Sequence, residues 1–427
     1  MNSISGNEVV FRGFKIATME PNSASLKCEL SNASLCDLAD QTEYGMLNET
    51  AIGVEGGKIK WLALERELDQ NELTFLQTVN GAGKLLTPGL IDCHSHLVFG
   101  GNRASEWEQR LNGSSYEEIA KQGGGILSTV SATRTATEEQ LFQSASKRIE
   151  SLLREGVTTV EIKSGYGLDL DSELKMLRVA NRLGADFPVC VEATLLAAHA
   201  VAPEFKGNPD GFIQFVCDTI IPQSVEFCSA VDVFCETIAF DLAQTKLVFE
   251  RAKQLDLNIK IHAEQLSYSG AAALAANMGA ISADHLEYLS EQDCVTLGRQ
   301  GTVATLLPGA FYCLNEKQKP PIAALRENQV PIAIATDSNP GSSPVLSLLL
   351  MGNMACNLFG LTPSEAIAGM TINAAKALRL DHSIGSIKKG KQADFATWNV
   401  SSPAELVYSI GGNPLAGVYK FGKRTHF

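Results

Sequence analysis

The stretch Leu90-Ile91-Asp92-Cys93-His94-Ser95-His96-Leu97 is apolar and carries two histidines at alternate positions. Successive side chains of a β-strand point to opposite faces, so Asp92, His94 and His96 are expected to share one face. Two imidazoles on one strand face can hold one metal ion, whereas two hydrogen-bonded core histidines can have the same spacing. The other histidines and carboxylates of the chain decide between these interpretations.

The composition is that of an ordinary globular protein. The chain has 427 residues, of which 45% are hydrophobic and 19% charged, which favours one large domain with a smaller one. The net charge of −13 argues against nucleic-acid binding, which needs a basic surface. We find no membrane-spanning apolar run and no signal-peptide pattern, so we expect a cytoplasmic protein. Ten cysteines without a Cys-x-x-Cys pair predict reduced thiols.

Seven more apolar segments of strand length follow the opening stretch, most of them separated by helix-compatible sequence. They are residues 157–163, 189–194, 231–236, 258–264, 280–285, 302–307 and 331–337. Strands that alternate with helices predict a parallel sheet, and eight such units fit a closed (β/α)8 barrel of the TIM type. An open doubly wound sheet would need a glycine-rich turn where this chain has His94-Ser95-His96.

Both ends of the chain have β character, and the segment 21–48 between the first strands is polar and irregular. Strands are expected at residues 9–11, 14–17, 385–387, 393–398 and 417–421, with a hairpin at 51–61. We therefore predict an α/β fold with a barrel over residues 87–380 and a small β-sandwich domain built from residues 1–86 and 381–427.

Capping signals mark some of the helices. We expect helices around residues 116–121 and 138–155. After the eighth strand, Ser343-Pro344 is expected to cap a helix over residues 345–358, and Thr362-Pro363-Ser364-Glu365 is a capping box that opens the next helix.

Five of the seven histidines fall at or just after the C-terminal ends of predicted strands, where (β/α)8 barrels carry their working residues. These histidines are His94, His96, His199, His262 and His285, and Asp337 ends the eighth strand. Imidazoles combined with a carboxylate suit Zn²⁺, with Fe²⁺ or another first-row ion as an alternative. The pattern predicts a metal site.

Several motifs resemble the amidohydrolase superfamily over nearly the whole chain. They are Pro88-Gly89-Leu90-Ile91-Asp92-Cys93-His94-Ser95-His96, the single His262 and His285 on consecutive strands, and Asp337. Within the superfamily, the segments 161–168, 197–200, 262–267 and 335–343 resemble the imidazolonepropionase family.

This resemblance implies that the cyclic amide of 4-imidazolone-5-propanoate is hydrolysed to N-formimidoyl-L-glutamate, in histidine degradation, by attack of metal-activated water. It implies one divalent ion, zinc or iron, and a homodimer without a nucleic-acid or membrane partner. The implied metal ligands are His94, His96, His262 and Asp337. The implied substrate-binding residues are Arg103, Tyr166, His199, Gln265, Asn339, Gly341 and Ser342.

The residue types suit this chemistry. We hypothesise that Asp337 takes the proton of the attacking water and passes it to the leaving nitrogen, while His285 polarises the carbonyl oxygen or helps to move the proton. Arg103 either grips a carboxylate or is a solvated loop residue, and Tyr166 either assists it or packs. The turn at 339–343 leads into a helix N-terminus, whose free N–H groups suit a second carboxylate; an ordinary helix cap is the alternative, and both can hold.

The fifth strand raises a question of proton transfer. Glu264 is expected to share a face with His262 and either assists proton transfer or orients its neighbours. Related deaminases commonly have a glutamate shuttle at the position that Gln265 occupies, which favours a hydrogen bond from Gln265 to the ring. Members with two metals usually have a lysine on strand four. This strand ends in Phe234-Cys235-Glu236, so we predict one metal, with Glu236 a hydrogen-bond acceptor rather than a second ligand.

Lys163, on the second strand, is better explained as the partner of Glu161 or another carboxylate than as a nucleophile.

Two other functions stay open. A cytosine- or guanine-type aminohydrolase would use the same metal ligands, although a neutral base offers no carboxylate to Arg103 and Tyr166. A non-catalytic barrel scaffold would have little need for a complete ligand set.

Overall fold

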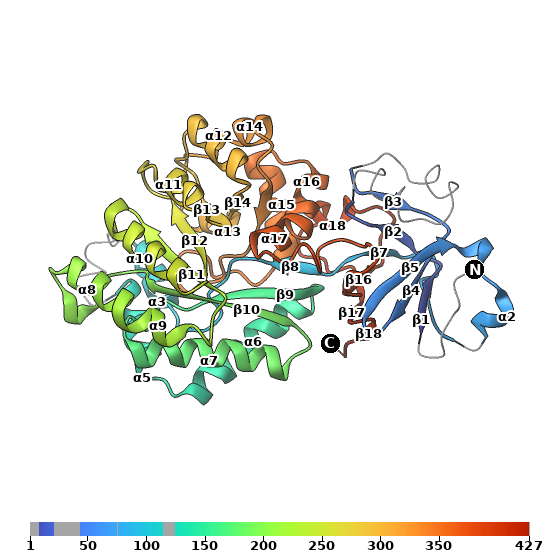
Figure 1. Ribbon diagram of the computed structural model, residues 1–427, viewed down its shortest axis with the longest axis horizontal. Helices are drawn as coiled ribbons and strands as arrows, with labels where there is room; N and C mark the ends of the chain where they lie inside the picture. Colours follow the sequence, from blue (N-terminus) through green and yellow to red (C-terminus); the bar gives the residue numbers. More distant parts are fainter. Residues whose placement is uncertain (1–7, 21–42, 75, 114–123, 427) are drawn as a thin grey trace. The chain divides into compact units, whose positions relative to one another are not determined.

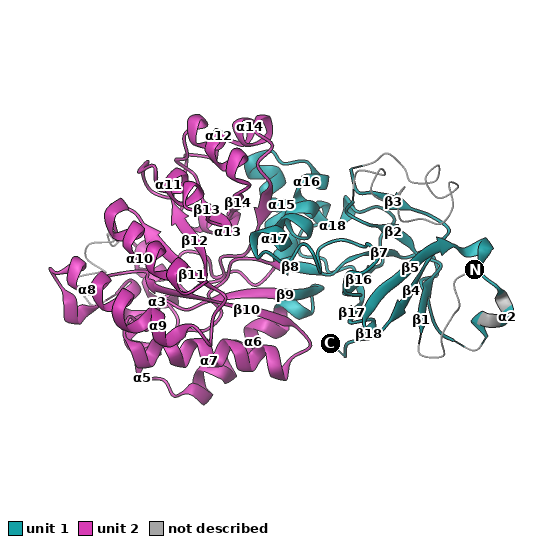
Figure 2. Cartoon of the chain, viewed as in Figure 1, with its two compact units in different colours: residues 1–91, 152–159, 348–427 teal, residues 92–151, 160–347 magenta. Residues whose placement is uncertain are grey.

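The computed structural model describes residues 8–20, 43–74, 76–113 and 124–426. The chain forms two compact units, one of residues 1–91, 152–159 and 348–427 and the other of residues 92–151 and 160–347 (Figure 2). The domain boundaries predicted from the sequence stay a prediction. The helix expected around residues 116–121 lies outside the described residues. Among the described helices, none has the length and apolar character needed to cross a membrane.

Eight strands pair in one sheet in the order of the chain (Figure 1). They are β8 (Leu90–Asp92), β9 (Val157–Lys163), β10 (Cys190–Ala198), β11 (Ala230–Cys235), β12 (Asn258–Ala263), β13 (Ser282–His285), β14 (Val303–Leu306) and β15 (Ile332–Ile334). Beyond β8 and β15 the chain forms a parallel bridge between Ser95 and Ser338, and the Asp337 amide donates to the His94 carbonyl at 2.9 Å. The sheet is therefore a nearly closed barrel, as predicted.

Helices separate most of these strands. They are α3 (Ala104–Leu111), α5 (Ile126–Thr135), α6 (Glu138–Leu153), α7 (Leu170–Asp186), α8 (Pro209–Phe215), α9 (Ile221–Ser224), α10 (Leu242–Gln254), α11 (Ala271–Asn277), α12 (Glu291–Gln300), α13 (Pro308–Cys313) and α14 (Ile322–Glu327), with η3 (Pro203–Phe205) and the π-helical η4 (Val216–Ile220). Two of them begin with clear local capping chemistry: the Asp169 side chain accepts from the Ser172 amide at α7, and Asp241 forms a capping box with Gln244 at α10.

The two chain ends form two further sheets. One has the order β5-β4-β1-β6 and the other the order β18-β17-β16-β7-β2-β3. Their strands are β1 (Val9–Arg12), β2 (Lys15–Ala17), β3 (Met46–Leu47), β4 (Thr50–Glu55), β5 (Lys58–Leu64), β6 (Gln77–Asn80), β7 (Leu85–Pro88), β16 (Phe395–Trp398), β17 (Leu415–Lys420) and β18 (Lys423–Arg424).

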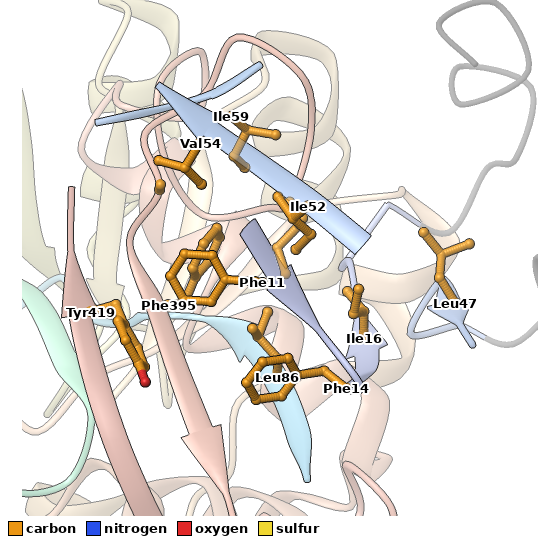
Figure 3. Close-up of a cluster of buried hydrophobic side chains, with 12 residues drawn as sticks. Phe11, Phe14, Ile16, Leu47, Ile52, Val54, Ile59, Leu86, Phe395 and Tyr419 are labelled. Carbon is orange, nitrogen blue, oxygen red and sulfur yellow. The ribbon is translucent and has the colours of Figure 1, made fainter. Parts of the chain in front are cut away.

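Buried side chains from both sheets share one hydrophobic core (Figure 3). Phe11 of the first sheet meets Phe395 of the second edge to face, with ring centroids 5.2 Å apart, and Tyr419 at 5.0 Å. Such aromatic pairs contribute beyond the area they bury. The predicted β-sandwich from both chain ends is therefore confirmed.

Short helices complete the described chain. They are η2 (Glu65–Glu67), α2 (Gln70–Leu73), α15 (Leu348–Met354), the π-helical η5 (Ala355–Phe359), α16 (Pro363–Gly369), α17 (Ile372–Ala377) and α18 (Glu405–Tyr408). The capping box predicted at Thr362 and Glu365 is confirmed at the start of α16.

Two local expectations were wrong. The helix expected from residue 345 begins at Leu348, because the Ser343 hydroxyl does not cap it and instead donates to the Thr336 carbonyl at 2.7 Å. Residues 385–387 form no strand, since Gly385 has φ +85° and turns the chain. In the segment 21–48, for which the sequence predicted no element, Met46–Leu47 pairs with β2 as β3.

Candidate metal centre

Four histidines and one aspartate from several strand ends meet in the unit of residues 92–151 and 160–347. Ligand atoms of His94, His96 and Asp337 lie within 4.8 Å of one another, and so do those of His94, His262 and His285. The Asp337 Oδ1 atom is 3.5 Å from Nε2 of both His94 and His96. The ring centroids of His94 and His262 are 4.5 Å apart. The four predicted ligands thus come together around His94.

Backbone geometry at the strand ends makes this cluster. Asp284 and His285 are neighbours on β13 and would point to opposite faces of a regular strand. His285 instead has φ +81° and Leu286 φ +73°, and Asp337 has φ +50°. Non-glycine residues rarely adopt positive φ, at a cost on the order of 1–3 kcal/mol each, and such residues gather at functional sites.

His94 and His96 also depart from the expected geometry, because β8 ends at Asp92 and both histidines lie beyond it. The extension that carries them is held instead by the Ser95 bridge to Ser338.

Two of the histidines lie beside buried aspartates, and His94 is hydrogen-bonded to its neighbour. His94 Nδ1 lies 2.6 Å from Asp284 Oδ2, and His262 Nδ1 lies 3.0 Å from Asp232 Oδ2. A carboxylate at Nδ1 fixes the tautomer and leaves Nε2 for a metal. The sequence reasoning missed both aspartates, although Asp284 directly precedes His285 and lies opposite His262 in the parallel register.

The donor atoms fit a divalent metal. Within the part of the chain that the structure describes, Nε2 of His94 and Nε2 of His262 are buried and have no hydrogen-bond partner. Leaving such an atom unpaired costs about 1–3 kcal/mol. A metal ion relieves that cost, and imidazole nitrogens with one carboxylate oxygen form a donor set that zinc and iron accept.

A network of buried charges adjoins the cluster. The Lys163 Nζ atom lies 2.6 Å from Asp232 Oδ2, 3.2 Å from Glu161 Oε1 and 3.6 Å from Asp284 Oδ2. Lys260 reaches the other Glu161 oxygen at 2.6 Å. Burial alone would lower the pKa of Lys163, but Asp232 and Glu161 more than offset it and raise that pKa. Lys163 therefore pairs with carboxylates, as predicted, and is a permanent cation.

The electrostatics assign different charge states to His285 and Asp337. Burial lowers the pKa of His285 to about 3, so its imidazole is neutral near pH 7. Burial alone would raise the pKa of Asp337, but the neighbouring His94 and His96 imidazoles hold it well below its usual range. The site thus combines a neutral imidazole with an ionised carboxylate, which is a usable pair for proton transfer.

Arg103, Tyr166 and Gly341 lie together. Arg103 Nε donates to the Thr129 hydroxyl at 2.8 Å, and a Cβ atom on Gly341 would lie 2.5 Å from Arg103 Nη1. Burial raises the pKa of Tyr166, and the charge of Arg103 partly offsets that rise. The Tyr166 ring centroid is 5.8 Å from that of His96, so this group borders the histidine cluster.

His199 also borders the cluster. Its ring stacks on His96, with centroids 5.6 Å apart and an interplanar angle of 18°. Its Nδ1–H donates to the Gly165 carbonyl at 3.0 Å, which leaves Nε2 as an acceptor. Burial holds the pKa of His199 well below 6.5, so the ring is neutral.

The chain leaves β12 at Glu264, which has φ +52°, so the face that it was predicted to share with His262 does not form. The Glu264 carboxylate accepts from the Ala271 and Ala272 amides at 2.8 and 3.0 Å and caps α11. These contacts suit an orienting role.

Glu236 accepts from the Gln265 amide at 2.8 Å and from the Ser267 hydroxyl at 2.8 Å. It is thus a hydrogen-bond acceptor that holds the Gln265 loop.

Asn339 organises the turn after β15. Its Oδ1 atom accepts from the Gly341 and Ser342 amides at 2.8 Å each, and its Nδ2 donates to the Asp337 carbonyl at 2.7 Å. The amides predicted to be free at a helix N-terminus are therefore already bonded, and α15 starts only at Leu348. The turn at 339–343 therefore does not lead directly into a helix N-terminus.

Comparisons with known proteins agree with this arrangement. Residues 85–425 match the amidohydrolase family. The chain is 53% identical to the imidazolonepropionase of Shewanella sp. strain ANA-3 over 397 residues, which covers 92% of this chain and 97% of that protein. It is 52% identical, with the same coverage, to the imidazolonepropionase of Shewanella oneidensis.

Solved structures share the fold at low identity. A 5-methylcytosine deaminase from Klebsiella pneumoniae, with bound 5-fluorocytosine, has a TM-score of 0.70 and 13% identity over 97% of this chain and 96% of that one. An adenosine deaminase from Xanthomonas campestris with bound zinc has a TM-score of 0.66 and 18% identity over 97% and 92% of the two chains.

Proposed function

Because this chain belongs to the amidohydrolase family and, within it, to the imidazolonepropionases, we propose that it hydrolyses 4-imidazolone-5-propanoate to N-formimidoyl-L-glutamate. The observation that carries the proposal is one arrangement: a cluster of histidines and an aspartate of lowered pKa borders an arginine and a tyrosine suited to a carboxylate. The histidine and aspartate side chains suit the opening of a cyclic amide by water, and the arginine and tyrosine suit the binding of the substrate's carboxylate.

We propose that His94, His96, His262 and Asp337 hold one divalent ion, zinc or iron. The unpaired Nε2 atoms of His94 and His262 support this ligand set. When bound, such an ion lowers the pKa of water and polarises a carbonyl oxygen.

The propionate group is held by Arg103 and Tyr166. The bond from Arg103 Nε to Thr129 orients the guanidinium, whose planar fork can hold a carboxylate through two hydrogen bonds. Gly341 leaves room for the guanidinium because it has no side chain. The Nε2 atom of His199 accepts a ring N–H, and Gln265 and Ser342 supply further polar contacts.

Asp337 and His285 have the proton-transfer and hydrogen-bonding roles in the reaction. Ionised Asp337 accepts a proton from the attacking water and delivers it to the leaving ring nitrogen. Neutral His285 donates a hydrogen bond to the carbonyl oxygen as negative charge develops there. Glu264, whose two oxygens bond the start of α11, orients the end of β12.

Metal removal tests the reaction. We expect purified protein to remove the ultraviolet absorbance of freshly prepared imidazolonepropionate. Dialysis against a chelator should reduce the rate at least about 100-fold, because the unassisted ring carbonyl is a poor electrophile, and zinc or ferrous iron should restore it. Protein dialysed without chelator is the control.

Two results would contradict the proposal. Release of ammonia from cytosine or guanine, with no loss of imidazolonepropionate, would indicate an aminohydrolase. A protein that binds no metal and consumes neither substrate would be a scaffold.

We further propose a cytoplasmic homodimer that binds neither nucleic acid nor membrane, with the sandwich domain formed by residues 1–86 and 381–427 and the barrel by residues 87–380. Sedimentation equilibrium measures the assembly, and limited proteolysis measures the boundaries.

A further inference from the structure

The loop after β9 carries Tyr166 and is bound by one carboxylate. Glu173, which is fully buried on α7, accepts three backbone N–H groups of this loop. Its Oε1 bonds the amides of Gly167 at 2.7 Å and Leu168 at 2.8 Å, and its Oε2 bonds the amide of Gly165 at 3.0 Å. The residues on both sides of Tyr166 are thus held by the same side chain.

The two glycines of this loop permit that contact. A Cβ atom on Gly167 would lie 2.6 Å from the Glu173 amide nitrogen and 2.9 Å from its Oε1. Gly165 has φ +105° and a Cβ there would lie 2.9 Å from His199 Nδ1. Other residues would displace the carboxylate or the imidazole.

The same contact reaches His199 through Gly165. The Gly165 amide donates to Glu173, and the Gly165 carbonyl accepts from His199 Nδ1–H at 3.0 Å. That second bond sets the tautomer of His199 and leaves its Nε2 as the acceptor.

Helix capping does not account for Glu173. The Asp169 side chain already caps α7 by accepting from the Ser172 amide at 2.8 Å, whereas all three backbone bonds of Glu173 run to the loop. A buried carboxylate is costly unless several donors satisfy it, and here the donors belong to the segment that carries Tyr166.

We propose that Glu173 is a positioning residue that orients Tyr166 and His199 together for the substrate. It touches neither the metal ligands nor the substrate and acts through the backbone of residues 165–168. This inference rests on the proposed function, because Tyr166 and His199 are substrate contacts only in that function.

Three variants test the proposal: Glu173→Ala, Glu173→Gln and, as the matched control, Asp171→Asn. Asp171 is an exposed acid on the same turn of α7, so its variant removes the same charge without touching the loop. Glutamine keeps the shape of the side chain but replaces one carboxylate oxygen by an NH₂ group. It can therefore accept from the amides on only one side of Tyr166, either Gly165 or Gly167 and Leu168.

We expect Glu173→Ala to raise KM for imidazolonepropionate about 10-fold or more and to change kcat less than about threefold, with an unchanged metal content. Glu173→Gln should fall between the alanine variant and wild type, and Asp171→Asn should match wild type. The ring ¹⁵N resonances of His199 should shift in both Glu173 variants.

An unchanged KM in both Glu173 variants would overturn the proposal, and so would a loss confined to kcat or to metal content. If Glu173→Ala does not fold, Glu173→Gln decides. If the wild type fails to hydrolyse the substrate, the proposed function is wrong. The positioning role of Glu173 can then still be tested with crystal structures of the wild type and Glu173→Gln. Unchanged positions of Tyr166 and His199 in that variant would overturn the role.

Discussion

Single buried acceptors hold the loops that surround the histidine cluster. Glu173, Glu236 and Asn339 each bind at least two backbone amides of one loop, and Glu264 binds two amides at the start of α11. These side chains are engaged in loop structure, whereas Arg103 presents its terminal nitrogens beside Gly341. At the residue scale, we propose that the arginine and the histidines contact the substrate and that the acceptors hold the neighbouring loops in place.

Replacing Arg103 tests the carboxylate contact. We expect Arg103→Lys to raise KM about 10-fold or more with little change in kcat, because an ammonium cannot form the two parallel hydrogen bonds of a guanidinium. Steady-state kinetics on imidazolonepropionate measure the separate effects on KM and kcat. Arg110→Lys, on the same helix α3, is the control, and an equal KM in the two variants would refute the assigned contact.

Replacing His285 tests the proton chemistry. His285→Asn suits the site because asparagine tolerates the φ of +81°. We expect kcat to fall about 10²- to 10⁴-fold while metal content is retained, since no imidazole remains at the carbonyl oxygen. Turnover within about threefold of wild type, in this variant or in His285→Ala, would remove His285 from the mechanism.

At the element scale, the residues of the histidine cluster gather at the ends of the strands. β9 is buried at every position, and the left-handed residues Glu264, His285 and Asp337 lie at the last residue of a strand or just beyond it. Some helix starts, such as those of α7, α10 and α16, have short local capping motifs, which can be tested one at a time.

The capping box of α16 offers such a test. The Thr362 hydroxyl accepts from the Glu365 amide at 3.2 Å, and the Glu365 side chain accepts from the Thr362 amide at 2.7 Å. We expect Thr362→Ala to lower the free energy of unfolding by about 1 kcal/mol, measured by urea denaturation. Thr362→Ser keeps the hydroxyl and should stay close to wild type; equal losses in both variants would speak against the cap.

At the scale of the whole molecule, burial of neutral histidines links stability to pH. Burial holds the pKa of His199 well below 6.5, whereas the unfolded chain protonates this histidine near its ordinary value. As the pH falls through 6.5, the His199 imidazole becomes protonated in the unfolded state but stays neutral in the folded state. Stability is therefore lost on acidification.

His199→Gln isolates this effect. The metal-free wild type should lose about 1.4 kcal/mol relative to the variant between pH 7.5 and pH 5.5, the amount expected for a histidine that stays neutral when folded. Urea denaturation of both proteins at the two pH values measures the difference. A difference that does not vary with pH would contradict a neutral His199.

The sequence by itself determined those features that depend on near neighbours in the chain or on hydrophobic periodicity. Apolar segments located the eight strands of the barrel, and the residues at their ends supplied His94, His262 and Asp337. The Thr362 capping box depends on neighbours three positions apart, so it too could be read directly.

Only the tertiary structure decided which distant residues orient these groups. His94 and Asp284 are 190 positions apart and meet at 2.6 Å because the barrel closes, and no local pattern reports closure. His285 joins the cluster through a left-handed backbone that strand alternation excludes. Glu173 meets the Tyr166 loop because Gly165 and Gly167 admit it. Strand positions follow from short-range periodicity, whereas these contacts exist only once the packed barrel brings their partners together.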